Sequence, residues 1–480
     1  MAVFPIRIPV NPFRKFGCFL TFRTEVVMAS TGNIRSLCSH EVIGFDMDHT
    51  LVRYKLPAIR TLVQKCLSTS LIESNKAPSS ILDDARALDF LVMKGVVCDK
   101  RRGNLLKLSA DSNIIMAYHG SRSLSESEIT TEYGSGVRID CVKADLCAGQ
   151  RSEHYFFFDN YFDSPAIPIL AALIDWTDAK LEHKWEPGAK ERDYSDIWTP
   201  LIEAFNTTFR CGAFKEGTGG FFPTLQKDPE PYVRQVTPGA RRWLAELRRQ
   251  GSQLFVLTSS HSDFAHFLLD YSYGPSWRED FAVVGVNARK PGFFAEPPSS
   301  RPFFSLNDHF EKVECSVSDL KQNMVFAQGN CAGLNEFFAR LTGKESPKVA
   351  YFGDSIRSDV LCLNKGNWDP VAIVEELFVE SPSNIPPRVH VSNSVQNGNG
   401  CSSPPLAKRA KMEEKSINGT DVDADFDTLR SSAWGSFFAH DGGADTLCAN
   451  MLQERAYACV PCLPEVAASH ENSSSGEHTG

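Results

Sequence analysis

The sequence predicts an α/β protein built on a Rossmann-like parallel sheet with helices on both faces. Five short apolar runs, each bounded by polar or turn residues, have the pattern of buried strands. These runs are Val42–Phe45, Leu254–Leu257, Phe281–Val286, Val349–Phe352 and Val371–Val374. The stretches between the later runs are long enough for crossover helices, which favours parallel pairing. Open sheets of this kind bind ligands at the carboxyl ends of their strands, so polar residues there are candidates for a site.

Length and composition are typical of a soluble globular chain with several units. The chain has 480 residues, which corresponds to roughly three domains of ordinary size. No run of about 18 apolar residues occurs, so we expect no membrane-spanning helix. The 50 basic and 59 acidic residues leave a formal charge of -9, which argues against nucleic acid as a partner. The 14 cysteines are scattered, which is typical of reduced thiols inside the cell.

The two ends of the chain differ from its body. The first 24 residues carry basic but no acidic side chains, as transit peptides do, although three prolines interrupt any long amphipathic helix. We therefore expect residues 1–39 to be a disordered leader of a cytoplasmic protein, with a mitochondrial transit peptide as the alternative. Pro, Ser, Asn and Gly dominate the later part, which predicts a disordered linker at 381–430 before a C-terminal tail at 431–480.

An inserted domain is predicted between the first two strands. About 200 residues separate these strands, which is more than a single crossover uses. We expect a catalytic core at 40–55 and 236–380, with an α+β insert at 56–235. The insert shows helical periodicity around Ile59 to Leu71 and an aromatic cluster from Tyr155 to Phe162.

Two acidic residues directly follow the first predicted strand. The segment Ile43-Gly-Phe-Asp46-Met-Asp48-His-Thr50 places Asp46 and Asp48 two positions apart, with one residue between them. Side chains two positions apart on an extended chain face the same way, so the two carboxylates would converge. Mg²⁺ would relieve their repulsion, because it prefers oxygen ligands and shares carboxylates with substrate phosphate. The alternative is a strand-to-turn junction at which Asp48 only caps a helix.

Further reactive side chains recur in order near the ends of the later strands. Thr258 ends the second strand, Lys290 follows the third, and the pair Asp354 and Asp359 follows the fourth. Each residue has an ordinary alternative as a helix cap, a turn residue or a solvated charge. It is less plausible that all of these alternatives hold at once, in this order, than that the residues share one site.

This order of motifs resembles the haloacid dehalogenase superfamily of phosphohydrolases. Its four motifs are DxDxT, a strand-terminal Ser or Thr, a Lys and a pair of acidic residues. Longer matches resemble the cytosolic purine 5′-nucleotidase family and cover about residues 40 to 380. These matches are Gly44-Phe-Asp-Met-Asp-His-Thr-Leu, Gly103-Asn-Leu-Leu-Lys107, Asn287-Ala-Arg-Lys-Pro-Gly-Phe-Phe294 and Tyr351-Phe-Gly-Asp-Ser.

The resemblance implies a phosphomonoester hydrolase with one Mg²⁺ ion. Asp46 would be the nucleophile that forms an aspartyl-phosphate, and Asp48 would be the general acid and base. The metal would be held by the Asp46 carboxylate, the Asp48 main-chain carbonyl and Asp354. Among the other site residues, Thr258 and Lys290 would contact the phosphoryl group, and Ser259 and Asp359 would support them.

The resemblance also places substrate recognition in the insert, as a cap over the site. Phe162 and Asp163 align with a Phe-Asn segment that reads the base in purine-cleaving relatives, and Lys215 aligns with a substrate-binding lysine. Ile202, Asn206 and Phe209 stand where those relatives use charged or imidazole side chains. We therefore expect a nucleoside monophosphate or similar small phosphomonoester as substrate, with altered or weak nucleotide specificity.

Two alternatives stay open. Phe162 and Phe209 could belong to the core of the cap, and the chain could be a weakly catalytic scaffold protein that keeps the phosphatase fold. A homo-oligomer is also compatible with the sequence.

Overall fold

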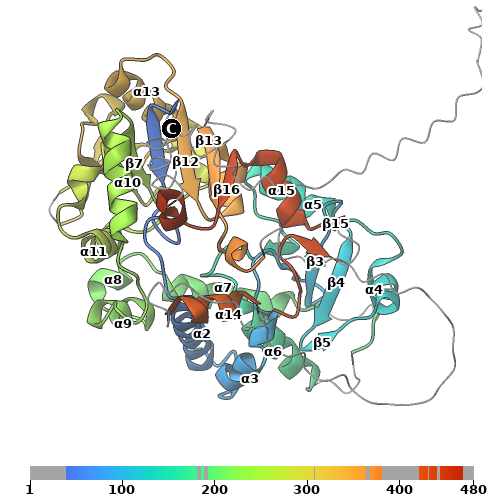
Figure 1. Cartoon of the computed structure of the whole chain (residues 1–480). Coiled ribbons are helices and arrows are strands. Elements are labelled where there is room, and N and C mark those ends of the chain that lie inside the picture. The colour runs from blue at the N-terminus through green and yellow to red at the C-terminus, as the bar shows by residue number, and fades with distance from the viewer. Residues whose placement is uncertain are drawn as a thin grey trace, which may run out of the picture.

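The structure is a computed structural model that describes residues 39–180, 185–188, 193–307, 309–363, 368–380, 421–430, 432–440 and 444–468 (Figure 1). Positions 1–38 of the predicted leader at 1–39 and positions 381–420 of the predicted linker lie outside the described residues. In the part of the chain that is described, no helix is both long enough and apolar enough to cross a bilayer.

The main sheet has nine strands in the order β10-β9-β11-β8-β7-β1-β12-β13-β16. Strands β8, β7, β1, β12, β13 and β16 pair in parallel, as do β11 and β8, whereas β9 pairs antiparallel with both β10 and β11. The bounds are β1 (Val42–Phe45), β7 (Gln253–Leu257), β8 (Val283–Val286), β9 (Phe303–Leu306), β10 (Lys312–Cys315), β11 (Met324–Gln328), β12 (Val349–Gly353), β13 (Trp368–Ile373) and β16 (Ala458–Val460). All five predicted strands are present, and the predicted parallel-dominated α/β class is confirmed.

Helices cover both faces of this sheet because successive strand residues point to opposite sides. On one face Ile43 and Phe45 share a hydrophobic core with α10 and α11, and on the other face Val42 shares a core with α12 and α13. The helices of this part are α10 (Pro238–Arg249), α11 (Ser262–Tyr273), α12 (Gly292–Ala295) and α13 (Cys331–Thr342). The short helical turns are η3 (Trp277–Asp280), η4 (Pro298–Ser300), η5 (Val317–Asp319), η6 (Ile356–Leu361) and η8 (Glu375–Phe378).

The chain between β1 and β7 contains a second sheet, which lies apart from the first in Figure 1. Its strands pair antiparallel in the order β5-β4-β3-β2-β6. They are β2 (Val97–Asp99), β3 (Asn104–Leu108), β4 (Ile114–His119), β5 (Arg122–Ser123) and β6 (Tyr155–Phe157). The helices are α2 (Leu56–Glu73), α3 (Ile81–Ala87), η2 (Asp89–Leu91), α4 (Glu126–Tyr133), α5 (Asp140–Ala148), α6 (Ala166–Asp178), α7 (Ser195–Thr208), α8 (Ala213–Glu216) and α9 (Phe221–Lys227).

The C-terminal part of the chain packs on both sheets. Its elements are α14 (Asp421–Arg430), β14 (Ala439–His440), β15 (Ala444–Asp445), α15 (Leu447–Arg455) and β16, which extends the main sheet. Residues 421–430, expected to end the disordered linker, instead form α14 beside α2 (Figure 1). This helix is held in place because the Asp425 carboxylate accepts a hydrogen bond from the Leu56 amide at 2.8 Å and pairs with Arg234 at 2.5 Å. Trp434 is buried and donates its indole N–H to the Leu91 carbonyl at 2.8 Å.

Candidate active site

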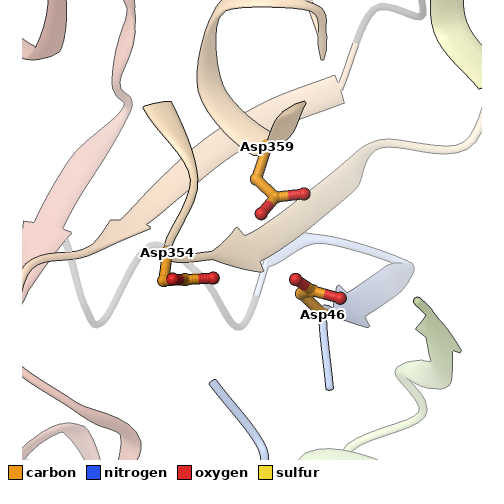
Figure 2. Close-up of side chains that lie close together, drawn as sticks. All are labelled: Asp46, Asp354 and Asp359. Carbon is orange, nitrogen blue, oxygen red and sulfur yellow. The ribbon is translucent and has the colours of Figure 1, made fainter. Parts of the chain in front are cut away.

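Three carboxylates meet at the carboxyl ends of the central strands (Figure 2). Asp46 follows β1, Asp354 follows β12, and Asp359 lies on the η6 turn beyond it. One oxygen of each carboxylate lies within 4.8 Å of an oxygen of the other two. Asp359 reaches this point because Gly353 carries no side chain: a Cβ added there would lie 2.3 Å from the Asp359 Cβ. The fold therefore gathers acids from two separate motifs at one place.

This acidic cluster fits a divalent cation. Asp354 Oδ2 is buried and has no hydrogen-bond partner among the described residues. Burial, followed by the charges of Asp46 and Asp359, raises the pKa of Asp354 well above its usual range. Burial also raises the pKa of Asp359 to about 7, although Lys290 opposes the shift. A group of carboxylates that repel one another, with one buried oxygen left without a partner, is a donor set that Mg²⁺ suits.

Lys290 pairs with two of the three acids. Its Nζ lies 3.0 Å from Asp46 Oδ1 and 2.5 Å from Asp359 Oδ1, and it donates to the Tyr351 hydroxyl at 2.8 Å. The lysine side chain is only 2% exposed. Burial alone would lower the pKa of Lys290, but Asp359 and Asp46 outweigh it and raise the pKa well above its usual value. The lysine is therefore a fixed cation beside the Asp46 carboxylate.

The Asp48 carboxylate does not join this cluster. It accepts hydrogen bonds at 2.6 Å from the Ser260 and Tyr54 hydroxyls. The expected convergence of the Asp46 and Asp48 carboxylates assumed an extended chain. Instead, β1 ends at Phe45 and the chain then turns. Burial, then the charge of Asp46, raises the pKa of Asp48 to about 6, against the effect of the two hydroxyls. A carboxyl group with a pKa near neutrality is suited to exchanging protons.

The two residues after β7 hold neighbouring backbone in place. Thr258 is buried, and its Oγ1 accepts a hydrogen bond from the Ser260 amide at 3.0 Å. The Ser259 hydroxyl accepts from the Lys290 amide at 3.0 Å, so it helps to position the lysine segment. Sequence reasoning missed Ser260 and Tyr54 as partners of Asp48. The run of serines after Thr258 was the available signal for Ser260.

A cavity of about 290 Å³ opens beside these groups. The predicted catalytic residues Asp46, Asp48, Thr258 and Lys290 line it, as do Ser259, Asp354 and Asp359. Its other walls come from the chain between β1 and β7 and from the segments after β7 and β12, and they combine polar side chains, such as those of Asn160 and Ser358, with five aromatic ones. These aromatic residues are Phe162, Phe209, Phe221, Phe222 and Phe264. The structure thus brings the predicted catalytic residues and Phe162 to a single cavity.

Two predicted substrate-binding residues do not line this cavity. The Asp163 carboxylate turns back into its own loop and accepts hydrogen bonds from the Asp159 and Asn160 amides at 3.1 and 3.0 Å. Lys215 is exposed on α8. Sequence reasoning missed two histidines that do line the cavity, His49 and His261, each with an unpartnered ring nitrogen among the described residues. Their positions inside the first and second motifs were the available signal.

A parallel sheet that gathers these four motifs at its strand ends defines the haloacid dehalogenase-like class of proteins. The chain belongs to the 5′ nucleotidase family, whose model matches residues 34–393. It is 31% identical over 404 residues to the human protein named 5′-nucleotidase domain-containing protein 1, across 84% of this chain and 82% of that protein. The cattle protein of the same name matches equally well. Human 5′-nucleotidase domain-containing protein 2 is 28% identical over 351 residues, across 71% of this chain and 62% of that protein.

These comparisons confirm the resemblance at the level of the family. Membership supports a nucleotidase-like phosphatase, a hydrolase, as the class of enzyme.

Proposed function

We propose that the chain is a Mg²⁺-dependent phosphomonoester hydrolase of the 5′-nucleotidase type. Its substrate would be a nucleoside monophosphate, and its intermediate an aspartyl-phosphate on Asp46. The observation that carries this proposal is the grouping of Asp46, Asp354 and Asp359 beside the buried Lys290, at the rim of a cavity. Family membership supports the same class of reaction.

The position of Asp46 supports its role as the nucleophile. Its carboxylate lies at the end of β1 and lines the cavity, and the Met47 amide donates a hydrogen bond to its Oδ1 at 2.8 Å. The Lys290 ammonium group also pairs with Asp46 Oδ1. Asp46 Oδ2 would therefore be the oxygen that attacks phosphorus in line with the leaving alkoxide. The new bond is between Asp46 and phosphorus, and the bond that breaks is between phosphorus and the substrate oxygen. Splitting hydrolysis in this way replaces one difficult displacement with two easier ones.

The surroundings of Asp48 support its role as the proton donor and acceptor. Its carboxyl group lines the same cavity, and its raised pKa of about 6 keeps a protonated fraction available near neutral pH. Asp48 would give its proton to the leaving oxygen and then take one from the water that hydrolyses the aspartyl-phosphate. Tyr54 and Ser260 hold the carboxyl group in position throughout.

The remaining polar groups would bind the phosphoryl group and the metal. Thr258 would donate a hydrogen bond to a phosphoryl oxygen, and Lys290 would offset the negative charge that phosphate adds beside Asp46. The Asp46 and Asp354 carboxylates, with the Asp48 main-chain carbonyl, would hold Mg²⁺, and Asp359 would support Lys290. When bound, Mg²⁺ would neutralise charge on the phosphoryl oxygens.

The aromatic walls of the cavity support altered or weak nucleotide specificity. Phe162 lies with its ring centre 5.9 Å from that of Phe209, and Phe209 stands where purine-cleaving relatives have a polar reader. Neither Asp163 nor Lys215 lines the cavity to replace that reader. A mainly apolar pocket separates related ligands by only roughly 10–200-fold, much less than a pocket built on hydrogen bonds.

Release of inorganic phosphate tests this proposal. Purified protein with Mg²⁺ should hydrolyse members of a panel of nucleoside monophosphates and sugar phosphates, and a chelator should abolish the release until Mg²⁺ is restored. Activity that persists in excess chelator would contradict the metal requirement. A chain that hydrolyses no member of the panel would favour the scaffold alternative.

Ser260→Ala should move the pH dependence of turnover in a defined direction. The serine hydrogen bond lowers the pKa of Asp48, because it stabilises the ionised form. The leaving-group step needs protonated Asp48, so kcat falls as pH rises through this pKa. Removing the bond raises the pKa and shifts the alkaline limb of the kcat profile to higher pH, with a lower maximum. Ser276→Ala, at an exposed serine away from the site, is the control that should leave the profile in place.

A further inference from the structure

Two stretches of chain connect the main sheet to the segment between β1 and β7. Residues 53–56 lead from the loop after β1 into α2, and residues 232–235 lead back toward α10 and β7. We call these two stretches the connector pair. They run antiparallel, and the Lys55 amide donates a hydrogen bond to the Tyr232 carbonyl at 2.8 Å. They are the covalent links between that segment and the main sheet, so any relative movement of the two has to displace them.

The connector pair carries Tyr54, whose hydroxyl holds the Asp48 carboxyl group. Tyr54 lies opposite Val233 in the connector pair, and its side chain is fully buried. Its hydroxyl donates a hydrogen bond to Asp48 Oδ1 at 2.6 Å. Hydrogen bonds weaken steeply as they lengthen and bend. A small displacement of the connector pair would therefore change the position of the carboxyl group that is proposed to protonate the leaving oxygen.

Helix α14, from the C-terminal part of the chain, joins the two connectors through one carboxylate. Asp425 is buried, and its Oδ1 accepts a hydrogen bond from the Leu56 amide at 2.8 Å. Leu56 begins α2, and the preceding Lys55 makes no side-chain cap, so this amide has no partner within its own helix. The other oxygen, Oδ2, pairs with the Arg234 guanidinium at 2.5 Å. Leu56 lies on the outgoing connector and Arg234 on the returning one.

The same helix packs on the turn that follows β13. The ring centre of Phe426 in α14 lies 5.2 Å from that of Phe378 in η8. The Arg53 guanidinium of the outgoing connector lies 5.7 Å from the centre of the Phe378 ring and pairs with Glu375 of the same turn at 3.4 Å. The Glu375 side chain is only 2% exposed. Helix α14 therefore restrains the connector pair against the main sheet through several contacts.

We propose that Asp425 is a positioning residue for Asp48, and that it acts by restraining the connector pair and thereby the hydroxyl of Tyr54. The proposal rests on the proposed function, in which Asp48 protonates the leaving oxygen. Asp425 does not itself line the cavity, and neither does any other residue of α14 that the structure describes. Loss of the Asp425 carboxylate should therefore slow the departure of the leaving alcohol and leave the groups that would bind phosphate in place.

Two esters that differ in their leaving group test the proposal. The alkoxide that leaves from a nucleoside monophosphate needs a proton, whereas p-nitrophenyl phosphate releases a stable phenolate that does not. Values of kcat/KM cover the steps up to departure of the alcohol, so the later hydrolysis of the aspartyl-phosphate does not enter the comparison. Both are measured on the full-length chain with Mg²⁺, at the pH optimum of each variant, with the nucleoside monophosphate of the panel that is cleaved fastest.

Asp425→Ala should lower the ratio of kcat/KM for the nucleoside monophosphate to kcat/KM for p-nitrophenyl phosphate by about tenfold. This is part of the roughly 10²–10⁴-fold that positioned proton transfer contributes. A general loss of folded protein would lower both values together and leave the ratio as it was. Asp427→Ala, at an exposed aspartate of the same helix, is the matched control and should leave the ratio unchanged.

Further variants test the route from Asp425 to Asp48. Tyr54→Phe keeps the buried ring but removes the hydroxyl, so it should lower the same ratio. Adding Asp425→Ala to Tyr54→Phe should lower it no further, because the effect of Asp425 depends on that hydroxyl. Asp425→Asn keeps the shape and an acceptor for the Leu56 amide but removes the charge beside Arg234. It should lower the ratio by less, and it replaces Asp425→Ala in these comparisons if the alanine variant does not fold.

Hydrogen exchange supplies a readout that does not depend on activity. The Leu56 amide should exchange faster in Asp425→Ala than in the unmodified chain, because it loses its acceptor. Unchanged exchange, an unchanged ratio in a folded Asp425 variant or in Tyr54→Phe, or effects that add in the double variant would overturn the proposal. An unmodified chain that cleaves neither ester would contradict the proposed function, and the positioning role of Asp425 with it. Exchange at Leu56 would still show whether α14 restrains the connector pair.

Discussion

Asp46→Asn should slow phosphate release by roughly 10⁴-fold or more, the scale on which loss of one member of a catalytic unit acts in other hydrolases. An amide of nearly the same shape fills the position but is not nucleophilic, so no aspartyl-phosphate can form. The substitution also removes negative charge beside Asp354, whose pKa the Asp46 charge helps to raise. The fold should therefore survive. Steady-state assays with Mg²⁺, together with a thermal melt, measure both effects.

Asp140→Asn is the matched control for this change. Asp140 is an aspartate on α5 whose side chain is 62% exposed, and it pairs with Arg138 at 2.9 Å on the surface. It should release phosphate at the rate of the unmodified chain. Equal turnover by Asp46→Asn and Asp140→Asn would mean that another group attacks phosphorus, or that a contaminating phosphatase carries the signal.

Lys290→Met should destabilise the fold by about 3–5 kcal/mol, the range for breaking a buried ion pair by removing one partner. Methionine is close in size, so the loss comes mainly from charge. The carboxylates of Asp46 and Asp359 would remain buried without their cation, and Asp359 is fully buried. Denaturant unfolding measures the change in the free energy of unfolding. Phosphate release should also fall sharply, because no cation would remain to offset phosphate beside Asp46.

Two comparisons separate this effect from a general loss of lysine. Lys344 pairs with Glu41 at 2.5 Å, but its side chain is 57% exposed, and Lys344→Met should cost about 0–1 kcal/mol. Adding Asp359→Asn to Lys290→Met removes one of the two buried carboxylates left unpaired and should restore part of the lost stability. Equal costs at Lys290 and Lys344 would show that the buried pairs do not hold the site together.

The core strands could be predicted because each is a continuous apolar run buried on both faces of the sheet. Strands without that pattern could not: β16 has only three residues, and the edge strand β10 is largely exposed. The linker was predicted to reach 430 from composition alone. Composition cannot predict that the Asp425 carboxylate accepts a hydrogen bond from the Leu56 amide at the start of α2, because the two residues are far apart in sequence.

The catalytic motifs could be predicted because their residues follow strands whose ends meet at one edge of the sheet. The substrate pocket was less predictable. The alignment predicted that Asp163 contacts the base of the substrate. Its carboxylate instead accepts hydrogen bonds from two amides of its own loop. His49 lies inside the first motif, yet nothing in its spacing shows that three aromatic rings surround it. Such contacts depend on how distant segments approach one another.

Metal binding in the absence of substrate tests the central claim most directly, because it requires no knowledge of the natural ligand. Mn²⁺, a spectroscopically visible substitute for Mg²⁺, can be titrated into the full-length chain while electron paramagnetic resonance reports the free ion. We predict one bound ion per chain, displaced by excess Mg²⁺ and lost in a folded Asp354→Asn variant. A chain that binds no ion, or an Asp354→Asn variant that binds as tightly as the unmodified chain, would contradict the assignment of the acidic cluster as the metal site.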